Sequence, residues 1–172
     1  MAGSTSVTAT GSLLRGLFVG GTLCQESRII ATAALGEDRG HTFVDFGDDA
    51  YTEGRAHPMI DPTLRLERIA AEGNDPHCGV LLLDLVLGHG AHPDPAPELA
   101  EAIQAARKAA GAAGRELPVV VSLTGTRGDP QGTSATAAVL TAAGASVHLS
   151  NAEATRTALS LLSGTDHAGG SR

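Results

Sequence analysis

The sequence predicts an α/β fold built on a doubly wound parallel sheet of five strands. Short β-branched runs alternate with longer Ala-rich amphipathic stretches along the chain, which is the pattern of repeated strand–helix units. The run GVLLLDLVL at residues 79–87 is apolar almost throughout, as expected of a central parallel strand that helices cover on both faces. The predicted fold class rests on these two observations.

The first two strand–helix units occupy the amino-terminal half of the chain. A strand is predicted at residues 17–19, followed by GGT and a helix over about residues 23–35. A second strand is predicted at residues 41–46, and a helix over about residues 62–72 follows an Asp/Gly-rich loop. Apolar residues at helical spacing predict that this helix buries one face, made of Leu64, Leu66, Ile69 and Ala70.

The other three units follow the same pattern. Strands are predicted at residues 79–87, 118–123 and 145–149, and helices over residues 97–113, up to about residue 143, and over residues 152–162. Asn151 is predicted to cap the last helix, because Asn side chains accept hydrogen bonds from the free amides at helix starts. Right-handed crossovers favour a flavodoxin-like sheet with the strand order 2-1-3-4-5.

Composition places these units in one domain. Residues 1–12 and 163–172 are small, polar and Gly/Ser-rich, so we expect disordered tails around a single domain at residues 13–162. Apolar residues make up 42% of the chain but aromatic residues only 2%, so Ala, Val, Leu and Ile must build the core.

Charge and cysteine use exclude several classes of protein. The net charge is -7 and the pI is near 5.4, which gives no basic surface for nucleic acid or an anionic membrane. Asp84 interrupts the longest apolar run, which is shorter than the roughly 20 residues of a membrane span. Cys24 and Cys78 match neither a zinc spacing nor a secreted disulfide framework, so we expect reduced thiols in a cytoplasmic protein.

Ligands of doubly wound sheets bind at the carboxyl ends of the strands. The candidate site therefore lies in four loops, at residues 20–22, 47–61, 88–97 and 124–132. In the first loop, Gly20, Gly21 and Thr22 stand between a strand and a helix, where free amides and the helix dipole can bind an anion. The alternative is an ordinary tight turn, and neither a dinucleotide fingerprint nor a P-loop is present.

The loop GHGAHPDPAP repeats this layout after the central strand. Gly88 and Gly90 open the turn, and prolines fix the entry into the next helix. His89, His92 and Asp94 are candidates for substrate contact, acid–base catalysis or metal binding. A zinc site needs further strong ligands, and none lies nearby in the sequence, so no metal is predicted. The alternative is a pair of plain surface histidines.

The loop at residues 47–61 is longer than a strand–helix connection needs. Arg55 offers a planar fork for a carboxylate or phosphate, and His57 offers an acid–base group. Asp48 and Asp49 could tune His57, contact substrate or hold magnesium, while an internally salt-bridged loop is the alternative. The fourth loop adds three candidates for an oxygen-binding rim, with an ordinary turn as the alternative: Thr124, Gly125 and Thr126.

These loops, in this order, resemble the carboxyl-terminal part of FdrA proteins, which are related to the succinyl-CoA synthetases. The matching strings are GLFVGGTLCQES, VDFGDDAYTEGRAHPMIDP, LLLDLVLGHGAHPDPAPELAEAI, VVVSLTGTRGDPQ and AAGASVHLSNAEATRTA. The resemblance covers about residues 13–162 and implies a flavodoxin-like ligase-CoA domain. In the synthetases, helix starts at loops like residues 20–22 and 88–97 point at a phosphate carried by a histidine, so the resemblance implies that these loops hold a phosphoryl or carboxylate group.

The resemblance also implies a function. FdrA proteins resemble subunits of an oxamate carbamoyltransferase, which works with partner subunits to cleave oxalurate with phosphate into oxamate and carbamoyl phosphate. We therefore expect a subunit of an acyl- or carbamoyl-transferring enzyme that is not active alone. Arg55 would hold a substrate carboxylate, and His57 or His92 would move a proton. Phosphate, or an acyl or carbamoyl phosphate, is the expected ligand.

The sequence departs from the family pattern in two ways. It lacks the phosphohistidine motif of GHAGAI type, so neither His89 nor His92 is given that role. It also lacks the amino-terminal CoA-binding domain of longer relatives and any ATP-grasp segment, so CoA is expected only with a partner subunit that supplies the missing domain. Three alternatives stay open: a non-catalytic assembly or regulatory subunit, an acyl-CoA ligase-type subunit, and a small-molecule binding module.

Overall fold

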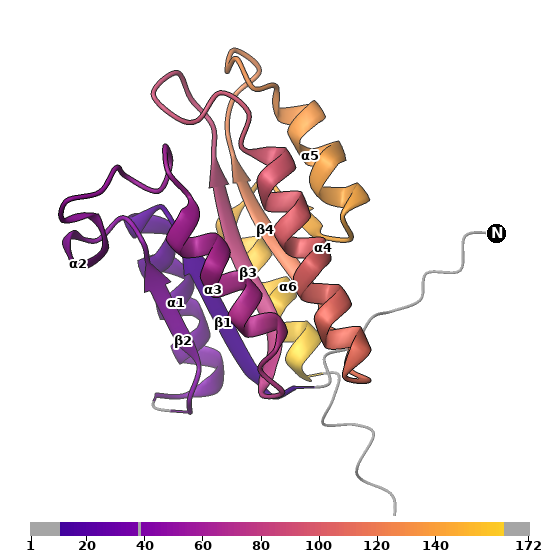
Figure 1. The fold of residues 1–172 in the computed structure, drawn as a ribbon. Coiled ribbons are helices and arrows are strands. Elements are labelled where there is room, and N and C mark those ends of the chain that lie inside the picture. The colour runs from indigo at the N-terminus through magenta and orange to yellow at the C-terminus, as the bar shows by residue number, and fades with distance from the viewer. Residues whose placement is uncertain (1–10, 38, 164–172) are drawn as a thin grey trace, which may run out of the picture.

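The computed structural model describes residues 11–37 and 39–163 and places them in one layered α/β unit (Figure 1). Its five strands are all parallel and lie in the order β2-β1-β3-β4-β5. This order confirms the predicted flavodoxin-like topology. Most of each predicted tail, at residues 1–10 and 164–172, lies outside the described residues.

A longer helix follows each strand, and the short helix α2 lies between β2 and α3. The strands are β1 (Leu13–Phe18), β2 (Thr42–Asp45), β3 (Cys78–Val86), β4 (Val119–Thr124) and β5 (Ser146–His148). The helices are α1 (Gly21–Leu35), α2 (Asp49–Thr52), α3 (Thr63–Gly73), α4 (Ala96–Ala112), α5 (Thr133–Ala142) and α6 (Asn151–Ser163). The predicted bounds agree with these to within two residues, apart from the start of β1, and the short helix α2 was not predicted.

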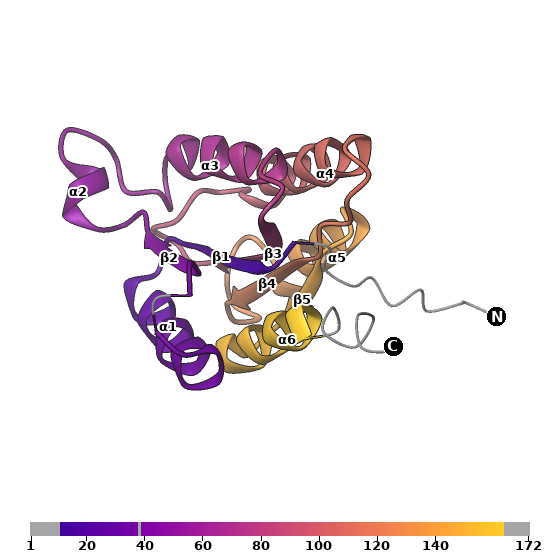
Figure 2. The same cartoon turned by 90° about the horizontal axis from the view of Figure 1, so that it is seen from below.

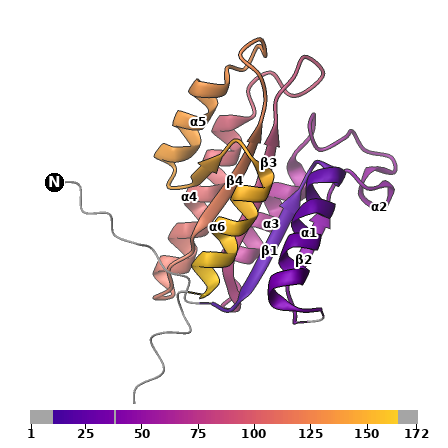
Figure 3. The same cartoon turned by 180° about the vertical axis from the view of Figure 1, so that it is seen from behind.

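Helices cover both faces of the sheet, with α3 and α4 on one face and α1 and α6 on the other (Figures 2 and 3). Successive side chains of the central strand β3 point alternately to the two faces of the sheet. Leu81 and Leu83 belong to the apolar cluster under α3 and α4, whereas Val80 and Leu82 belong to the cluster under α1 and α6. No helix among the described residues is both long and apolar enough to cross a membrane.

Strand β1 begins four residues earlier than predicted, because Arg15 and Gly16 interrupt the apolar pattern that predicts a strand. Arg15 nevertheless fits inside the sheet, where its Nε lies 3.4 Å from Oε2 of the buried Glu72. A Cβ atom at Gly16 would lie 2.7 Å from the ring of Phe18 and 2.8 Å from that of Phe43. Glycine therefore makes room for two aromatic rings at this point of the strand.

Helix α3 buries a face that differs in part from the predicted one. Ile69 is fully buried, and Leu64 and Leu66 pack against the core as predicted. The prediction for Ala70 is wrong, because this residue is exposed, one position around the helix from Ile69. Arg65 is buried instead, with 3% of its surface exposed. A charged side chain can take this inward position because it reaches an acidic partner in the sheet, described below.

The predicted capping role of Asn151 is wrong, because Ser150 holds the capping position of α6. The hydroxyl oxygen of Ser150 accepts a hydrogen bond from the amide of Glu153 at 3.3 Å. Asn151 is the first residue of the helix, and its side-chain amide donates to the Leu23 carbonyl and the Ser27 hydroxyl, both at 3.0 Å. Asn151 therefore links α6 to α1 and does not cap α6.

Both cysteines are free and buried, as expected of reduced thiols. Cys24 lies in α1 and Cys78 at the start of β3, on opposite faces of the sheet. Burial raises the pKa of Cys24 to about 11 and that of Cys78 to about 12. Thiols in such surroundings carry little of the thiolate form that reacts with electrophiles.

We predict that neither thiol of the folded chain reacts appreciably with iodoacetamide at pH 8, where roughly one Cys24 in a thousand is ionised. Mass spectrometry of the intact chain measures the modification. Unfolding in guanidinium chloride before labelling is the control, and it should give modification of both cysteines. Rapid labelling of the native chain would contradict the buried placement of the thiols.

Candidate functional site

The predicted loops lie at the carboxyl edge of the sheet, and hydrogen bonds join three of them (Figure 1). The backbone amide of His92, after β3, donates to the carbonyl of Met59, after β2, at 2.7 Å. The side-chain amide of Gln131, after β4, donates to the carbonyl oxygens of Gly88 at 2.8 Å and His92 at 3.0 Å. These three loops therefore form one connected surface.

A buried ion pair joins α3 to β3 close to the carboxyl ends of β1 and β3. Asp84 is completely buried, and its two carboxylate oxygens accept the amides of Val19 and Gly20, each at 2.8 Å. Nη1 of Arg65, from α3, lies 2.9 Å from Oδ1 of Asp84. The helices that follow β1 and β3 leave toward opposite faces of the sheet, so this is the topological switch point where ligands of doubly wound folds bind. Here the switch point holds the protein's own charges.

The low-polarity surroundings dominate the ionisation of this pair. Burial raises the pKa of Asp84 above its usual value, while Arg65 and the two amides act in the opposite direction. Burial likewise lowers the pKa of Arg65, and the neighbouring carboxylate opposes that change. Each charge is thus tolerated in the core only because the other is present.

This arrangement corrects part of the predicted anion site. The amide of Gly20 donates to Asp84, and the amide of Gly88 donates to Oε1 of Gln131 at 3.3 Å. The expectation that these two amides are available to a phosphate is therefore wrong, because the chain's own side chains already satisfy them. Internal acceptors of this kind remove the cost of leaving buried amides unpaired.

Gly21 and Thr22 form the exposed first turn of α1, which has no side-chain cap and no acidic residue of its own. A carboxylate from the neighbouring strand lies close to this turn, since a Cβ atom at Gly21 would be 2.9 Å from Oδ2 of Asp45. Oδ1 of Asp45 accepts the amide of Gly47 at 2.8 Å. Asp45 thus places negative charge near the positive end of the α1 dipole, where an external anion would have to compete with it.

His57 and His92 have the same local geometry. Each is followed by proline, and each Nδ1 accepts the amide two residues on, from Met59 at 3.2 Å and from Asp94 at 3.0 Å. A neutral imidazole whose Nδ1 is an acceptor carries its proton on Nε2. Both half-buried rings therefore offer an N–H donor at a fixed position on the carboxyl edge.

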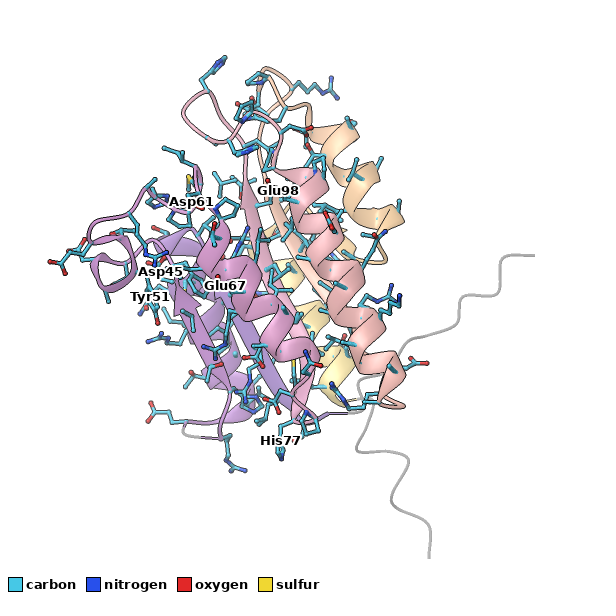
Figure 4. All side chains as sticks on the ribbon, in the orientation of Figure 1. Asp45, Tyr51, Asp61, Glu67, His77 and Glu98 are labelled. Atoms are coloured by element: carbon cyan, nitrogen blue, oxygen red, sulfur yellow. The ribbon has the colours of Figure 1, made fainter. Side chains whose placement is uncertain are left out.

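Arg55 does not lie with His92. It is exposed and lines a separate small depression with Tyr51 and Asp61, on the side of the molecule that carries α2 (Figure 4). Asp48 has a structural role, because its Oδ1 caps α2 by accepting the amide of Ala50 at 3.0 Å. The structure therefore separates the predicted carboxylate clamp from one of the two predicted proton carriers.

The other predicted residues lie at exposed positions at this edge. The exposed set is Asp49, His89, Gly90, Thr124, Gly125 and Thr126. The amide of Thr126 donates to Oδ2 of Asp129 at 2.5 Å, so the turn after β4 is closed by its own carboxylate. Within residues 11–37 and 39–163, no three His, Cys, Asp or Glu side chains are placed to hold a metal ion.

A small cavity lies between α3 and α4, close to the His92 turn. It has a volume of about 20 Å³, and its polar lining comes from Arg65, His92 and Glu98. Figure 4 shows Glu98 at the end of α4 that faces the loops. Apolar residues form the rest of the wall, among them Pro58, Met59, Leu66, Leu85 and Leu99. We call it the Arg65 cavity.

Sequence reasoning missed four residues that organise this edge: Asp45, Arg65, Asp84 and Gln131. For Asp84 a usable signal existed, because a single acidic residue inside a buried strand requires a buried partner. The partner itself had no such signal, since Arg65 stands among apolar residues of a helix at a position that also fits a solvated side chain.

Two comparisons with known proteins bear on this site. The chain matches the family model described as CoA-ligase over residues 17–161, a span that includes all four loops. It is also 41% identical over 131 residues to the uncharacterized protein YahF of Escherichia coli strain K12. That match covers 66% of this chain and 25% of YahF, so the chain spans about a quarter of the relative's length.

We predict that Asp84→Asn lowers the free energy of unfolding by about 3–5 kcal/mol, because it leaves the Arg65 charge buried without a partner. Urea denaturation measures the change. Asp94→Asn, the same change at an exposed position of this edge, is the control and should leave the unfolding midpoint in place. The double variant Arg65→Met/Asp84→Asn should recover much of the loss, and a double variant no more stable than Asp84→Asn would contradict the charge argument.

Proposed function

Because the chain belongs to the CoA-ligase family, we propose that it is an FdrA-like subunit of an enzyme that transfers an acyl or carbamoyl group to or from phosphate. The family is related to the succinyl-CoA synthetases, whose chemistry passes through acyl phosphates. An oxamate carbamoyltransferase-like reaction, in which phosphate cleaves oxalurate, is the reaction of this class that we propose. The enzyme would act only with partner subunits.

The observation that carries the proposal is the matched geometry of His57 and His92. In each ring Nδ1 accepts a backbone amide, so Nε2–H is the group available to a substrate. Acyl and carbamoyl transfer develop negative charge on oxygen, and a positioned donor or general acid at that oxygen accelerates such a step by typically 10²–10⁴-fold.

Phosphate would bind beside these rings, at groups that the chain does not already use. The first turn of α1, at Gly21 and Thr22, lacks a side-chain cap and remains the proposed anion contact. His89 and Gly90 at the exposed tip after β3 would complete this contact. Arg55 would hold a substrate carboxylate only if the substrate reaches across the loop after β2, because it lines a depression of its own.

The partner is proposed from the length of the relative. YahF is about four times as long as the matched region, so a homologous domain works in a longer protein. We propose that domains corresponding to the rest of YahF, including any CoA site, act together with this one.

A second function is supported by a specific observation. Asp84 and Gln131 satisfy the amides of Gly20 and Gly88, so these two amides need no ligand. A non-catalytic assembly subunit that kept the fold while another chain supplies the active site would have this property.

We predict that His57→Ala and His92→Ala each lower kcat/KM for oxalurate cleavage by phosphate about 10²–10⁴-fold in the complex reconstituted with partner subunits from neighbouring genes. Ala removes the ring and its N–H donor, whereas Gln would keep an amide N–H. His77→Ala, at the opposite end of the sheet (Figure 4), is the matched control and should keep full activity. Unchanged turnover in both site variants, with the complex intact, would instead support the assembly role.

A further inference from the structure

We propose that two copies of this chain associate through the outer face of helices α1 and α6. These helices lie side by side on one face of the sheet (Figures 2 and 3), joined by the bonds from Asn151 to Leu23 and Ser27. The inference goes beyond the transferase proposal and does not depend on it, because it concerns the association of the chain with itself. It rests on three features of this face: an exposed apolar groove, two charges of opposite sign, and the height of these charges along the groove.

The groove between α1 and α6 is open and has an apolar centre. Its apolar lining comes from Ile29, Ile30 and Ala152, and its volume is about 600 Å³. Ile29 is 61% exposed in the middle of α1. A small ligand is mostly enclosed when it is bound, which an open groove of this size does not offer. Neighbouring apolar side chains that stay open to water are instead typical of a protein–protein contact.

Each wall of the groove carries one charge. Glu26 lies on the α1 wall, and Arg156 lies on the α6 wall. Glu26 accepts a hydrogen bond from the side-chain amide of Asn151 at 2.7 Å. Among the residues that the structure describes, neither Glu26 nor Arg156 forms an ion pair, and the Arg156 guanidinium donates no hydrogen bond. Both charges are therefore available to a second molecule.

The two charges stand at nearly the same height along the groove. A hydrogen bond of 2.8 Å joins the hydroxyl groups of Ser27 in α1 and Thr155 in α6. Glu26 precedes Ser27 and Arg156 follows Thr155, so only about 3 Å of helix rise separates the two charges along the groove. Both helices begin at the carboxyl edge of the parallel sheet, so they run in the same direction.

These positions make the face complementary to itself. A two-fold axis along the groove places α1 of each copy over α6 of the other, which gives an isologous interface. Glu26 of each copy then faces Arg156 of the other, so two ion pairs form around a shared apolar centre. A partner whose surface carries charge of one sign would be repelled by one wall of the groove. The charge pattern therefore favours a second copy of the chain as the occupant.

The association is tested by sedimentation velocity on the full chain at pH 7 and about 0.15 M salt, where charges more than about 8 Å apart are largely screened. This condition limits the long-range repulsion between two chains of net charge -7. We expect a monomer–dimer equilibrium with a dissociation constant of about 1–100 µM. Ile29→Asp should weaken the dimer about tenfold or more, because it places a carboxylate in the apolar centre of the interface.

Charge reversal tests the two-fold arrangement. Glu26→Arg and Arg156→Glu should each remain monomeric, since like charges then face each other in both pairs. An equimolar mixture of these two variants should associate about as tightly as the unmodified chain, because opposite charges meet again in each pair. No effect within one chain produces such a recovery on mixing. Ile60→Asp, at a residue that is 56% exposed on the loop after β2, is the matched control and should dimerise normally.

A chain that stays monomeric at concentrations well above this range would overturn the inference, and so would one that associates only with a different subunit. A dimer that Ile29→Asp leaves unchanged would overturn it as well, as would a mixture of the two charge variants that stays monomeric while circular dichroism shows both folded. These results need no turnover, so they are distinguishable from failure of the transferase proposal, which the histidine variants test.

Discussion

The buried ion pair between Arg65 and Asp84 is the interaction on which the carboxyl end of the sheet depends. Asp84 belongs to β3, its oxygens hold the amides that end β1, and Arg65 brings in α3 from the other side. Two strands and a helix therefore share one electrostatic contact at the switch point of the fold. Because neither charge is tolerated alone in the core, the position of each element fixes that of the others.

The same contact changes what the edge can do chemically. In a fold of this type the amides after β1 are the natural cradle for an anionic ligand. Here an internal carboxylate takes the position of that anion, and Gln131 does the same for the amide of Gly88. In the proposed function, the groups used for chemistry are the Nε2–H groups of His57 and His92, together with the uncapped first turn of α1.

The proline-rich junction after β3 has a physical explanation in this arrangement. Proline follows both His57 and His92, and each ring turns back to accept the amide two residues later. The backbone of His92 then bonds to Met59 and to Gln131, so this junction holds three loops together. Proline limits the conformations of the unfolded loop, which lowers the entropy cost of fixing such a surface. Contacts within the chain therefore hold this edge together.

The sequence by itself determined the five strand–helix units, the strand order and the edge at which the loops lie, because hydrophobic periodicity and crossover handedness are local or general rules. It predicted His57 and His92 as site residues but not how they are oriented. Only the tertiary structure decided that Asp84 pairs with amides 64 and 65 residues away, and that Asn151 bonds to Ser27, 124 residues away, and does not cap its own helix. Such contacts depend on which strands and helices become neighbours, and no local pattern encodes that for a single polar side chain.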